Sequence, residues 1–204
     1  MTEPVNFALA EFLKSAPTLQ HCPADEGAEI AFAGRSNAGK SSAINCLTGQ
    51  SKLARTSKTP GRTQLLNFFT LSASQRIVDL PGYGFAKVPI AMKKEWDRNL
   101  ANYLQNRKSL KALVLLMDIR HPLQDYDWQM IQWAHQCSLP MHLLLTKADK
   151  LKNGPAKATQ LNVAQQVRLK GITNISVQTF SSLKKAGLDE LKQFLNQHLA
   201  TAEQ

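Results

Sequence analysis

The chain has 204 residues, a length that suits one well-buried domain and is short for two. It carries 25 lysine and arginine residues against 15 aspartate and glutamate residues, which gives a net charge of +10. The first 30 residues hold one of these bases and five of the acids, so the remainder carries +14. That excess excludes an acidic protein and favours a polyanionic partner, either nucleic acid or an anionic membrane, although a basic surface without such a partner fits equally well.

Cysteine usage and hydropathy exclude two further classes of protein. Cys22, Cys46 and Cys137 are odd in number and lack metal-like spacing, which argues against a disulfide framework and favours a reducing compartment. The longest strongly apolar run, residues 112–117, is too short to span a bilayer. The N-terminus shows no basic region followed by an apolar core, so we expect no signal peptide, no membrane span and a cytoplasmic location.

Hydrophobic spacing divides the chain into two regions. Residues 6–16 show helix-like apolar spacing and predict a short helix within an N-terminal extension of residues 1–27. Over residues 28–204, short apolar runs alternate with longer amphipathic stretches, which predicts one domain. We expect strands over residues 29–34, 64–72, 75–80, 111–119, 141–146 and 175–180, and helices over residues 40–49, 91–107, 122–136, 155–170 and 188–199.

This alternation predicts an α/β fold of three layers, in which a mostly parallel six-stranded sheet has helices on both faces. Residues 64–72 and 75–80 are separated by a short turn, so one strand at the edge of the sheet is expected to be antiparallel. Ligands of such sheets bind beyond the carboxyl ends of the strands. The glycine-rich and charged motifs of the chain all follow a predicted strand end.

The sequence GRSNAGKS matches the pattern G-x-x-x-x-G-K-[ST] and lies between a predicted strand and a predicted helix. Gly34 and Gly39 let the backbone curl, so that successive N–H groups and the helix N-terminus form an anion site. Lys40 would reach the β- and γ-phosphates of a nucleotide, and the hydroxyl of Ser41 would bind Mg²⁺. A glycine-rich turn without a ligand is the alternative, which the strand–helix context disfavours. The predicted phosphate-binding residues of this loop are Gly34, Arg35, Ser36, Asn37, Ala38, Gly39, Lys40 and Ser41.

The sequence TKAD, from Thr146 to Asp149, follows a predicted strand and indicates which base is bound. The Asp149 carboxylate can accept hydrogen bonds from N1–H and the 2-amino group of guanine, whereas adenine has no donor at either position. The stem of Lys147 can lie along the plane of the base. Ser181 and Ser182 follow the last predicted strand and would offer backbone N–H groups to guanine O6. The predicted guanine-binding residues are Thr146, Lys147, Asp149, Ser181 and Ser182. The alternative for TKAD is an aspartate that caps a helix, and the alternative for the two serines is an ordinary strand-to-helix turn.

The sequence VDLPG ends a predicted strand with the pattern D-x-x-G. Asp79 would hold Mg²⁺ through water, and the N–H of Gly82 would bond the γ-phosphate. The loop of residues 51–63 contains three threonines, of which Thr63 is our choice for a second Mg²⁺ hydroxyl because it directly precedes a strand. The basic residues of this loop suit RNA contact or a solvated surface equally well. A plain Pro-Gly turn is the alternative for VDLPG, and the order of the three motifs along the chain argues against it.

With these motifs in order, the chain resembles the EngB family of ribosome-biogenesis proteins, which are translation-factor-related P-loop GTPases. The resemblance rests on GRSNAGKS, SKTPGRTQLLNFF, DLPGYGFAKV, TKADK and FSSLKKAGLDEL, and extends from about residue 28 to residue 200. It implies a Ras-like GTPase fold, a Mg²⁺ ion and cycling between GTP-bound and GDP-bound forms. It also places the switch threonine on Thr63, with Gly61, Arg62 and Gly82 as further phosphate-binding residues.

The resemblance also implies a partner and a cellular role. Proteins of this family are cytoplasmic bacterial GTPases that assist maturation of the large ribosomal subunit. The expected partner is therefore the precursor of that subunit, with its rRNA and ribosomal proteins, and the chain is expected to be a monomer. A role in cell division and septation follows from the same resemblance. The charge of +14 outside the first 30 residues fits a surface that faces rRNA.

Tyr83 departs from the pattern of Ras-like GTPases, which carry at this position a glutamine that orients the attacking water. A phenol does not act in the same way, so we expect slow intrinsic hydrolysis and name no catalytic residue. Help from another residue, a cation or the ribosome is then needed. Asn37 in the phosphate loop is a candidate ligand for K⁺ beside the phosphates, or else a residue that only hydrogen-bonds the 51–63 loop or shapes the phosphate loop.

Two other functions compete with GTP hydrolysis on a ribosomal precursor. A nucleotide-gated adaptor, which binds RNA or protein and hydrolyses negligibly on its own, is compatible with Tyr83. A phosphotransferase would need an acceptor pocket and a lid, but the sequence has no insertion long enough for a lid. The TKAD segment also disfavours an adenine nucleotide as the phosphate donor.

Overall fold

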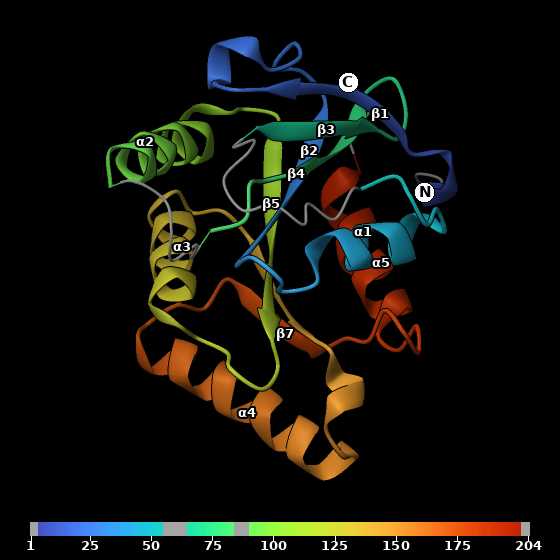
Figure 1. The fold of residues 1–204 in the computed structure, drawn as a ribbon, viewed down its shortest axis with the longest axis vertical. Coiled ribbons are helices and arrows are strands. Elements are labelled where there is room, and N and C mark those ends of the chain that lie inside the picture. The colour runs from blue at the N-terminus through green and yellow to red at the C-terminus, as the bar shows by residue number, and fades with distance from the viewer. Residues whose placement is uncertain (1–3, 55–64, 84–89, 201–204) are drawn as a thin grey trace.

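A computed structural model of the chain describes residues 4–54, 65–83 and 90–200, with the backbone alone at residues 90–93 and 96 (Figure 1). The strands are β1 (Glu11–Ala16), β2 (Ala28–Gly34), β3 (Leu66–Thr70), β4 (Gln75–Asp79), β5 (Leu110–Asp118), β6 (Met141–Thr146) and β7 (Ile175–Thr179). The α-helices are α1 (Lys40–Thr48), α2 (Ile90–Asn106), α3 (Asp125–Gln136), α4 (Asn153–Leu169) and α5 (Leu188–Leu199). Three short 3-10 helices are η1 (Phe7–Leu9), η2 (Leu19–His21) and η3 (Ala148–Lys150).

The described strands form one sheet, which confirms the predicted α/β class and the mostly parallel pairing. The strand order is β1-β3-β4-β2-β5-β6-β7. β3 runs antiparallel to both β1 and β4, and the remaining neighbours are parallel. In the centre of the sheet, Ile30 of β2 lies beside Ile77 of β4 and Ala112 of β5. The central strands are buried almost throughout, as expected for strands that are covered on both faces.

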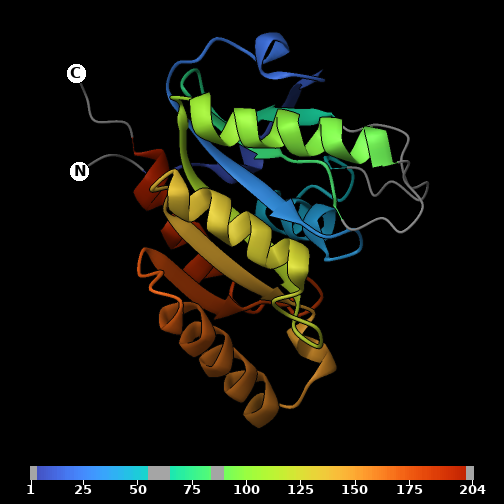
Figure 2. The same cartoon turned by 90° about the vertical axis from the view of Figure 1, so that its left-hand side faces the viewer.

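Helices cover the two faces of the sheet separately (Figure 2). On one face, Ile44 of α1 and Leu191 of α5 share a buried apolar cluster with Phe32 of β2. On the other face, α2, α3 and α4 contribute to a second cluster, which includes Tyr103 and Ile131. The three-layer arrangement predicted from the alternation of strands and helices is therefore confirmed. Within the described residues, no helix has the length and apolar character that a membrane crossing requires.

The helix predicted over residues 6–16 is wrong. η1 is a single 3-10 turn, and the residues after it form β1, which pairs with β3 at the edge of the sheet. The sheet consequently has seven strands instead of the six expected. Part of the segment 1–27 thus belongs to the same sheet as the strands of residues 28–204.

Packing explains why this segment reads as a helix but forms a strand. Phe7 and Ala10 are both buried, which accounts for their helix-like spacing in the sequence. The ring of Phe12 instead packs edge-on against Phe69 of β3, with 5.9 Å between the ring centroids. A helix of this length is marginal on its own in water, whereas the strand pairs with the otherwise open edge of β3.

A buried ion-pair cluster joins the amino ends of the central strands. Glu29 of β2 is fully buried. Its carboxylate accepts hydrogen bonds from Nε of Arg76 in β4 at 2.8 Å, and from Nη2 and Nε of Arg107 at 2.6 and 2.9 Å. The hydroxyl of Tyr103 donates to the same carboxylate at 3.3 Å. Both carboxylate oxygens are therefore paired, which is the condition under which a buried charge is tolerated.

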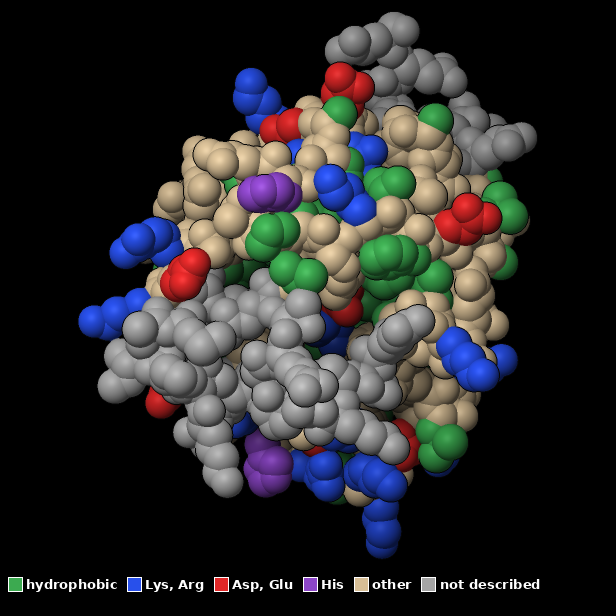
Figure 3. Space-filling view, turned by 45° about the horizontal axis from the view of Figure 1, so that its top comes forward, with side chains coloured by type: hydrophobic (Ala, Val, Ile, Leu, Met, Phe, Trp, Pro, Cys, Tyr) green, Lys and Arg blue, Asp and Glu red, His purple; other side chains and the backbone are tan. Residues whose placement is uncertain are grey.

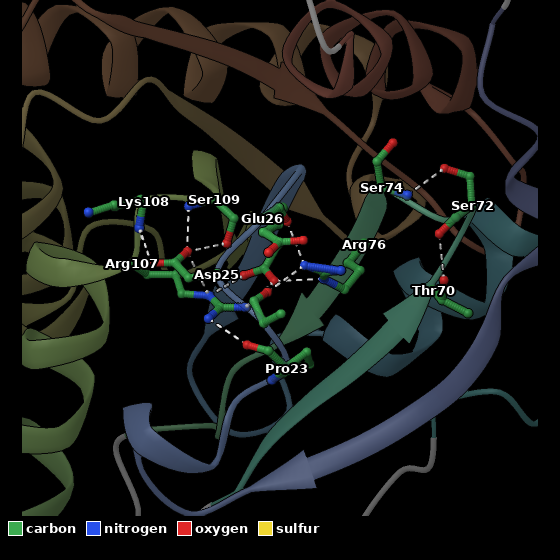
Figure 4. A network of polar contacts seen from close by, with 12 residues as sticks. Pro23, Asp25, Glu26, Thr70, Ser72, Ser74, Arg76, Arg107, Lys108 and Ser109 are labelled. Atoms are coloured by element: carbon green, nitrogen blue, oxygen red, sulfur yellow. Dashed lines mark hydrogen bonds and ion pairs between the residues drawn. The ribbon is translucent and has the colours of Figure 1, made fainter.

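The same two guanidinium groups fasten the segment that precedes β2 (Figure 4). Arg76 donates to the carbonyl oxygens of Ala24 and Glu26, at 2.9 and 2.6 Å. Arg107 donates to those of Pro23 and Ala24, at 2.8 and 3.2 Å. These bonds fix the direction in which the chain enters the sheet.

Asp25 connects this segment to the start of β5. Its carboxylate accepts from the N–H and the hydroxyl of Ser109, at 2.8 and 2.7 Å, and from the N–H of Lys108 at 3.0 Å. Burial acts to raise the pKa of Asp25, but these hydrogen bonds outweigh it and lower the pKa. The carboxylate is therefore held in its ionised form.

A second buried polar group lies between β6, β7 and α5. His142 of β6 is 2% exposed, with Nδ1 2.7 Å from Oγ of Ser176 and Nε2 2.7 Å from Oε1 of Gln178. Its ring stacks on Phe194 of α5, with 4.6 Å between the ring centroids. Burial lowers the pKa of His142 from its ordinary 6.5 to about 4, so the imidazole is neutral at pH 7.

Replacement of Arg107 by alanine should lower the free energy of unfolding by about 3–5 kcal/mol, because it leaves a buried carboxylate short of a partner. Urea denaturation measures the change. Arg168→Ala is the matched control, since Arg168 is exposed on α4 and its loss should cost less than about 0.5 kcal/mol. Equal stability of the two variants would contradict a central role for the cluster.

Neutral His142 should make the fold sensitive to acid. Because folding lowers this pKa, the stabilisation is complete above pH 6.5 and is lost as the pH falls towards about 4, by on the order of 3 kcal/mol. His198 has a pKa that burial also lowers, so it adds a loss of the same sign. Urea denaturation measures the free energy of unfolding at several pH values between 7 and 4.5. This free energy should fall less steeply with decreasing pH for His142→Gln than for the wild type. Parallel slopes would show that His142 does not titrate on unfolding.

Candidate nucleotide-binding site

The predicted phosphate loop connects β2 to α1 and is curled by two residues with left-handed backbone. Asn37 has a φ of 65°, and Gly39, which caps α1, has a φ of 89°. Backbone of this kind turns successive N–H groups to one side, as an anion site requires. Gly34 ends β2 where a Cβ atom would lie 2.8 Å from the carbonyl oxygen of Leu116 in β5, so a larger residue would clash with backbone. The loop therefore has the curled shape that its sequence predicts.

The TKAD segment holds this loop directly. The hydroxyl of Thr146, at the end of β6, lies 2.6 Å from the carbonyl oxygen of Ala38 and 3.1 Å from that of Met117. Nζ of Lys147 donates to the carbonyl oxygen of Asn37 at 2.7 Å. Two motifs that are more than a hundred residues apart in the sequence are thus in contact at the carboxyl ends of the strands.

The D-x-x-G segment also lies against the phosphate loop. The N–H of Ser36 donates to the carbonyl oxygen of Tyr83 at 2.8 Å. Gly82 is close to the same residue, since a Cβ atom on it would lie 3.5 Å from the Ser36 backbone. Asp79, at the end of β4, forms a largely buried ion pair with Lys40, the first residue of α1. The structure thus brings the D-x-x-G segment and the phosphate loop together.

These residues offer oxygen donors that suit Mg²⁺. The Asp79 carboxylate lies beside Lys40, and Ser41 follows Lys40 in the first turn of α1. Mg²⁺ prefers oxygen and is usually held by one or two protein ligands together with phosphate oxygens. Across residues 4–54, 65–83 and 90–200, no group of three or more histidine, cysteine, aspartate or glutamate side chains forms another candidate metal centre. Three of the predicted residues lie outside the described part of the chain, namely Gly61, Arg62 and Thr63.

The predicted guanine-binding residues meet at the ends of β6 and β7. Asp149 lies in η3 and accepts a hydrogen bond of 2.6 Å from the hydroxyl of Ser181. This bond lowers the pKa of Asp149 and favours its ionised form. The N–H of Ser181 donates to the carbonyl oxygen of Ala186 at 3.1 Å, and Ser182 follows in the same loop. Ser181 therefore orients Asp149 with its side chain, whereas the sequence had predicted that both serines offer N–H groups to the base.

Asp118 belongs to the same edge, although no motif indicated it. It ends β5, with its carboxylate 3.0 Å from Nζ of Lys147 and 2.6 Å from Nη2 of Arg120. The hydrogen bond from Arg120, followed by that from Lys147, holds the pKa of Asp118 well below its usual range. The one sequence signal for Asp118 was its place at the end of a predicted strand, because such residues gather at one edge of a parallel sheet.

Tyr83 is directed towards α3. Its side chain is buried, its hydroxyl donates to Asp127 at 2.9 Å, and its ring stacks on Tyr126 with 5.8 Å between centroids. Burial, together with the negative charge of Asp127, raises the pKa of Tyr83 well above its ordinary value. Its backbone pairs with that of Arg35 in the phosphate loop. Tyr83 thus ties the D-x-x-G segment to both the loop and α3, a packing role that the sequence did not predict.

Similarity to known proteins decides the family. A family model described as 50S ribosome-binding GTPase matches residues 29–147, which is more than half of the chain. The probable GTP-binding protein EngB of Pectobacterium carotovorum subsp. carotovorum is 57% identical over 203 residues, covering 100% of this chain and 96% of that relative. The chain belongs to the EngB family. A second EngB protein, from Alteromonas mediterranea, is 60% identical over 190 residues, which cover 93% of this chain and 89% of the relative.

Solved structures agree with the EngB assignment at the level of the fold. The crystal structure of a probable GTP-binding protein engB has 24% sequence identity and a TM-score of 0.67, covering 84% of this chain and 98% of that one. The structure of Era in complex with MgGDPNP and part of 16S ribosomal RNA has 21% identity and a TM-score of 0.63, covering 88% of this chain and 59% of that one. The predicted P-loop GTPase fold is confirmed, and membership of the EngB family makes the chain a GTP-binding protein of the GTPase class.

Proposed function

We propose that the chain is a GTP-hydrolysing assembly factor for the large ribosomal subunit, which binds the precursor of that subunit in a nucleotide-dependent manner. The observation that carries the nucleotide-binding part of this proposal is the direct contact between the curled phosphate loop and TKAD through Thr146 and Lys147. That contact supports a site in which the loop binds phosphate and the Asp149 carboxylate, held by Ser181, binds the base at the same edge of the sheet. A guanine nucleotide has the matching pair of groups.

In the proposed complex, residues 34–41 surround the phosphates and bind them through Lys40 and backbone N–H groups of the loop, with Gly61, Arg62 and Gly82 as further contacts. The N–H groups of Ser36 and Ala38 instead donate within the protein, to the carbonyl oxygens of Tyr83 and Arg35. Mg²⁺ would be held by Ser41 and Asp79, with Thr63 as an added ligand. When bound there, the ion offsets negative charge on the β- and γ-phosphates. K⁺ is a further candidate, because the side-chain amide oxygen of Asn37, an exposed residue of the loop, could coordinate it.

At the other end of the proposed complex, Asp149 accepts from guanine N1–H and the 2-amino group. Ser181 keeps that carboxylate in place. Since the N–H of Ser181 is bonded to Ala186, we assign the contact with guanine O6 to the N–H of Ser182. The aliphatic stem of Lys147 lies along the base, while its Nζ stays with Asn37.

The proposed partner is the large-subunit precursor, met in the bacterial cytoplasm through rRNA and ribosomal proteins, with effects on cell division. Three findings support it: the 50S ribosome-binding family model, the RNA-bound Era structure of similar fold, and the charge of +14 outside the first 30 residues. On the face in Figure 3, lysine and arginine side chains are spread among acidic ones. A charge distributed in this way attracts RNA without regard to its sequence, and the affinity falls steeply as the salt concentration rises.

Replacement of Asp149 by asparagine should shift nucleotide preference from GTP towards XTP. The amide can donate to the xanthine 2-oxygen, whereas the carboxylate accepts from the guanine 2-amino group. Equilibrium binding of fluorescent GDP and XDP analogues to wild type and variant measures the shift, which should be at least about a hundredfold in the ratio of the two affinities. A variant that keeps the full preference of the wild type for guanine would overturn the guanine assignment.

The rate of GTP hydrolysis distinguishes the proposed assembly factor from a nucleotide-gated adaptor. The adaptor is an alternative because Tyr83 replaces the glutamine that orients the attacking water in Ras-like GTPases. GTP turnover by the wild type should be slow alone and at least about tenfold faster with large ribosomal subunits, because the group that activates water must come from outside the Tyr83 position. Rates are measured in KCl and in NaCl at matched ionic strength, and Asn37→Ala should lose any advantage of K⁺.

Absence of stimulation, combined with tighter binding of the subunit in the GTP-analogue state than in the GDP state, would favour the adaptor. Equal subunit binding in both states would contradict nucleotide gating altogether. Identical rates in the two salts, with and without subunits, would remove K⁺ from the proposed ligands.

A further inference from the structure

The loop that carries Ser181 is fixed where it begins and where it ends by one buried amide. Gln178 of β7 is fully buried, and its Nε2 donates to the carbonyl oxygens of Gly187 at 2.8 Å and Thr179 at 3.3 Å. Gly187 caps α5, and Ser181 pairs with Ala186 just before it. A single side chain thus connects the strand that enters the loop with the residue at which the loop ends.

The other side of the same amide is anchored in β6. Oε1 of Gln178 lies 2.7 Å from Nε2 of His142, and Nδ1 of that ring lies 2.7 Å from Oγ of Ser176. Since Nε2 of Gln178 faces two carbonyl oxygens, its Oε1 must accept from the ring, which assigns the proton to Nε2 of His142. Each polar group of the amide is therefore satisfied. A buried network of this kind is rigid, because any shift leaves a polar group without a partner.

The junction has no room for adjustment. A Cβ atom on Gly187 would lie 2.6 Å from Nε2 of Gln178 and 2.5 Å from the carbonyl oxygen of Thr179. Gly187 also has a φ of 79°, which a larger residue adopts only with strain. Close backbone approach and the two hydrogen bonds act at the same point, so the end of the loop is held in one position.

We infer that Gln178 is a positioning residue for recognition of the base. The hydrogen bond from Gln178 fixes the position of Gly187, at the end of the loop. The pairing of Ser181 with Ala186 closes the loop, and the Ser181 hydroxyl then fixes the orientation of Asp149. The inference rests on the proposed function, because it assigns Asp149 to guanine. It adds that selectivity for guanine depends on an amide in β7 that touches neither the base nor Asp149.

The phosphate end of the site has separate supports, which makes the inference specific. Thr146 and Lys147 hold the phosphate loop from β6, and neither contact passes through Gln178. Loss of the amide should therefore loosen Asp149 while the phosphate loop keeps its position. A residue with only a packing role would lower stability without changing which base is preferred.

Gln178→Met keeps the length of the side chain and removes its hydrogen bonds. The ratio of the dissociation constants of inosine diphosphate and GDP measures selectivity, because hypoxanthine lacks the 2-amino group that Asp149 accepts from. The ratio should fall about three- to tenfold in the variant, and GDP should dissociate faster by a similar factor. Gln160→Met is the matched control. Gln160, on α4 at the opposite face, donates to the carbonyl oxygen of Val177 in the same strand at 2.6 Å, and its loss should leave the ratio unchanged.

An unchanged ratio in Gln178→Met, whatever its effect on the urea midpoint, would overturn the inference. Gly187→Ala displaces the same junction from the side of the loop, and it replaces Gln178→Met in the test where that variant does not fold. A wild type with no preference for GDP over inosine diphosphate would contradict the proposed function itself. Failure of the inference is thus seen in the variant, whereas failure of the proposed function is seen in the wild type.

Discussion

The hydroxyl of Thr146 is the contact on which the geometry of the site depends. It reaches Ala38 in the phosphate loop and Met117 in β5, while the carbonyl oxygen of Thr146 accepts from the N–H of Ile119 at 3.0 Å. A nucleotide bound in one conformation has a set distance between its base and its phosphates, so the groups that bind its two ends must stand at a matching separation. One side chain, placed between the loop and Asp149, sets that separation. Because Thr146 is buried, water does not compete for these bonds.

The two ends of the parallel strands use polar groups in opposite ways. At the amino ends, Glu29 is fully buried and paired with Arg76 and Arg107, an arrangement that tolerates no exchange of partners. At the carboxyl ends, the curled phosphate loop and the partly accessible ion pairs of Asp118 lie where we propose that the nucleotide binds. The amino-end cluster orders the strands and their N-terminal connection.

Motifs that act through their own backbone were predictable from the sequence, whereas features that depend on distant partners were not. The turn at residues 34–41 was predicted because Gly34 and Gly39 dictate its local shape. Residues 6–16 have helix-like spacing because Phe7 and Ala10 are buried, whereas the strand β1 depends on the open edge of β3, which the sequence alone does not reveal. Gln178 gave no signal at all, since a polar residue in a short strand is ordinary until His142 and Gly187 are placed beside it.

The pairing of Lys40 with Asp79 shows how the charges of such a site are balanced. Both side chains are largely buried, so either charge alone would be costly. In the proposed complex the ion pair separates. Lys40 then pairs with the negative phosphate oxygens, and Asp79 pairs with the positive Mg²⁺. If only one ligand bound, the remaining side chain would stay unpaired in a region of low dielectric. Nucleotide and metal should therefore favour each other's binding, and by linkage the coupling is equal in both directions.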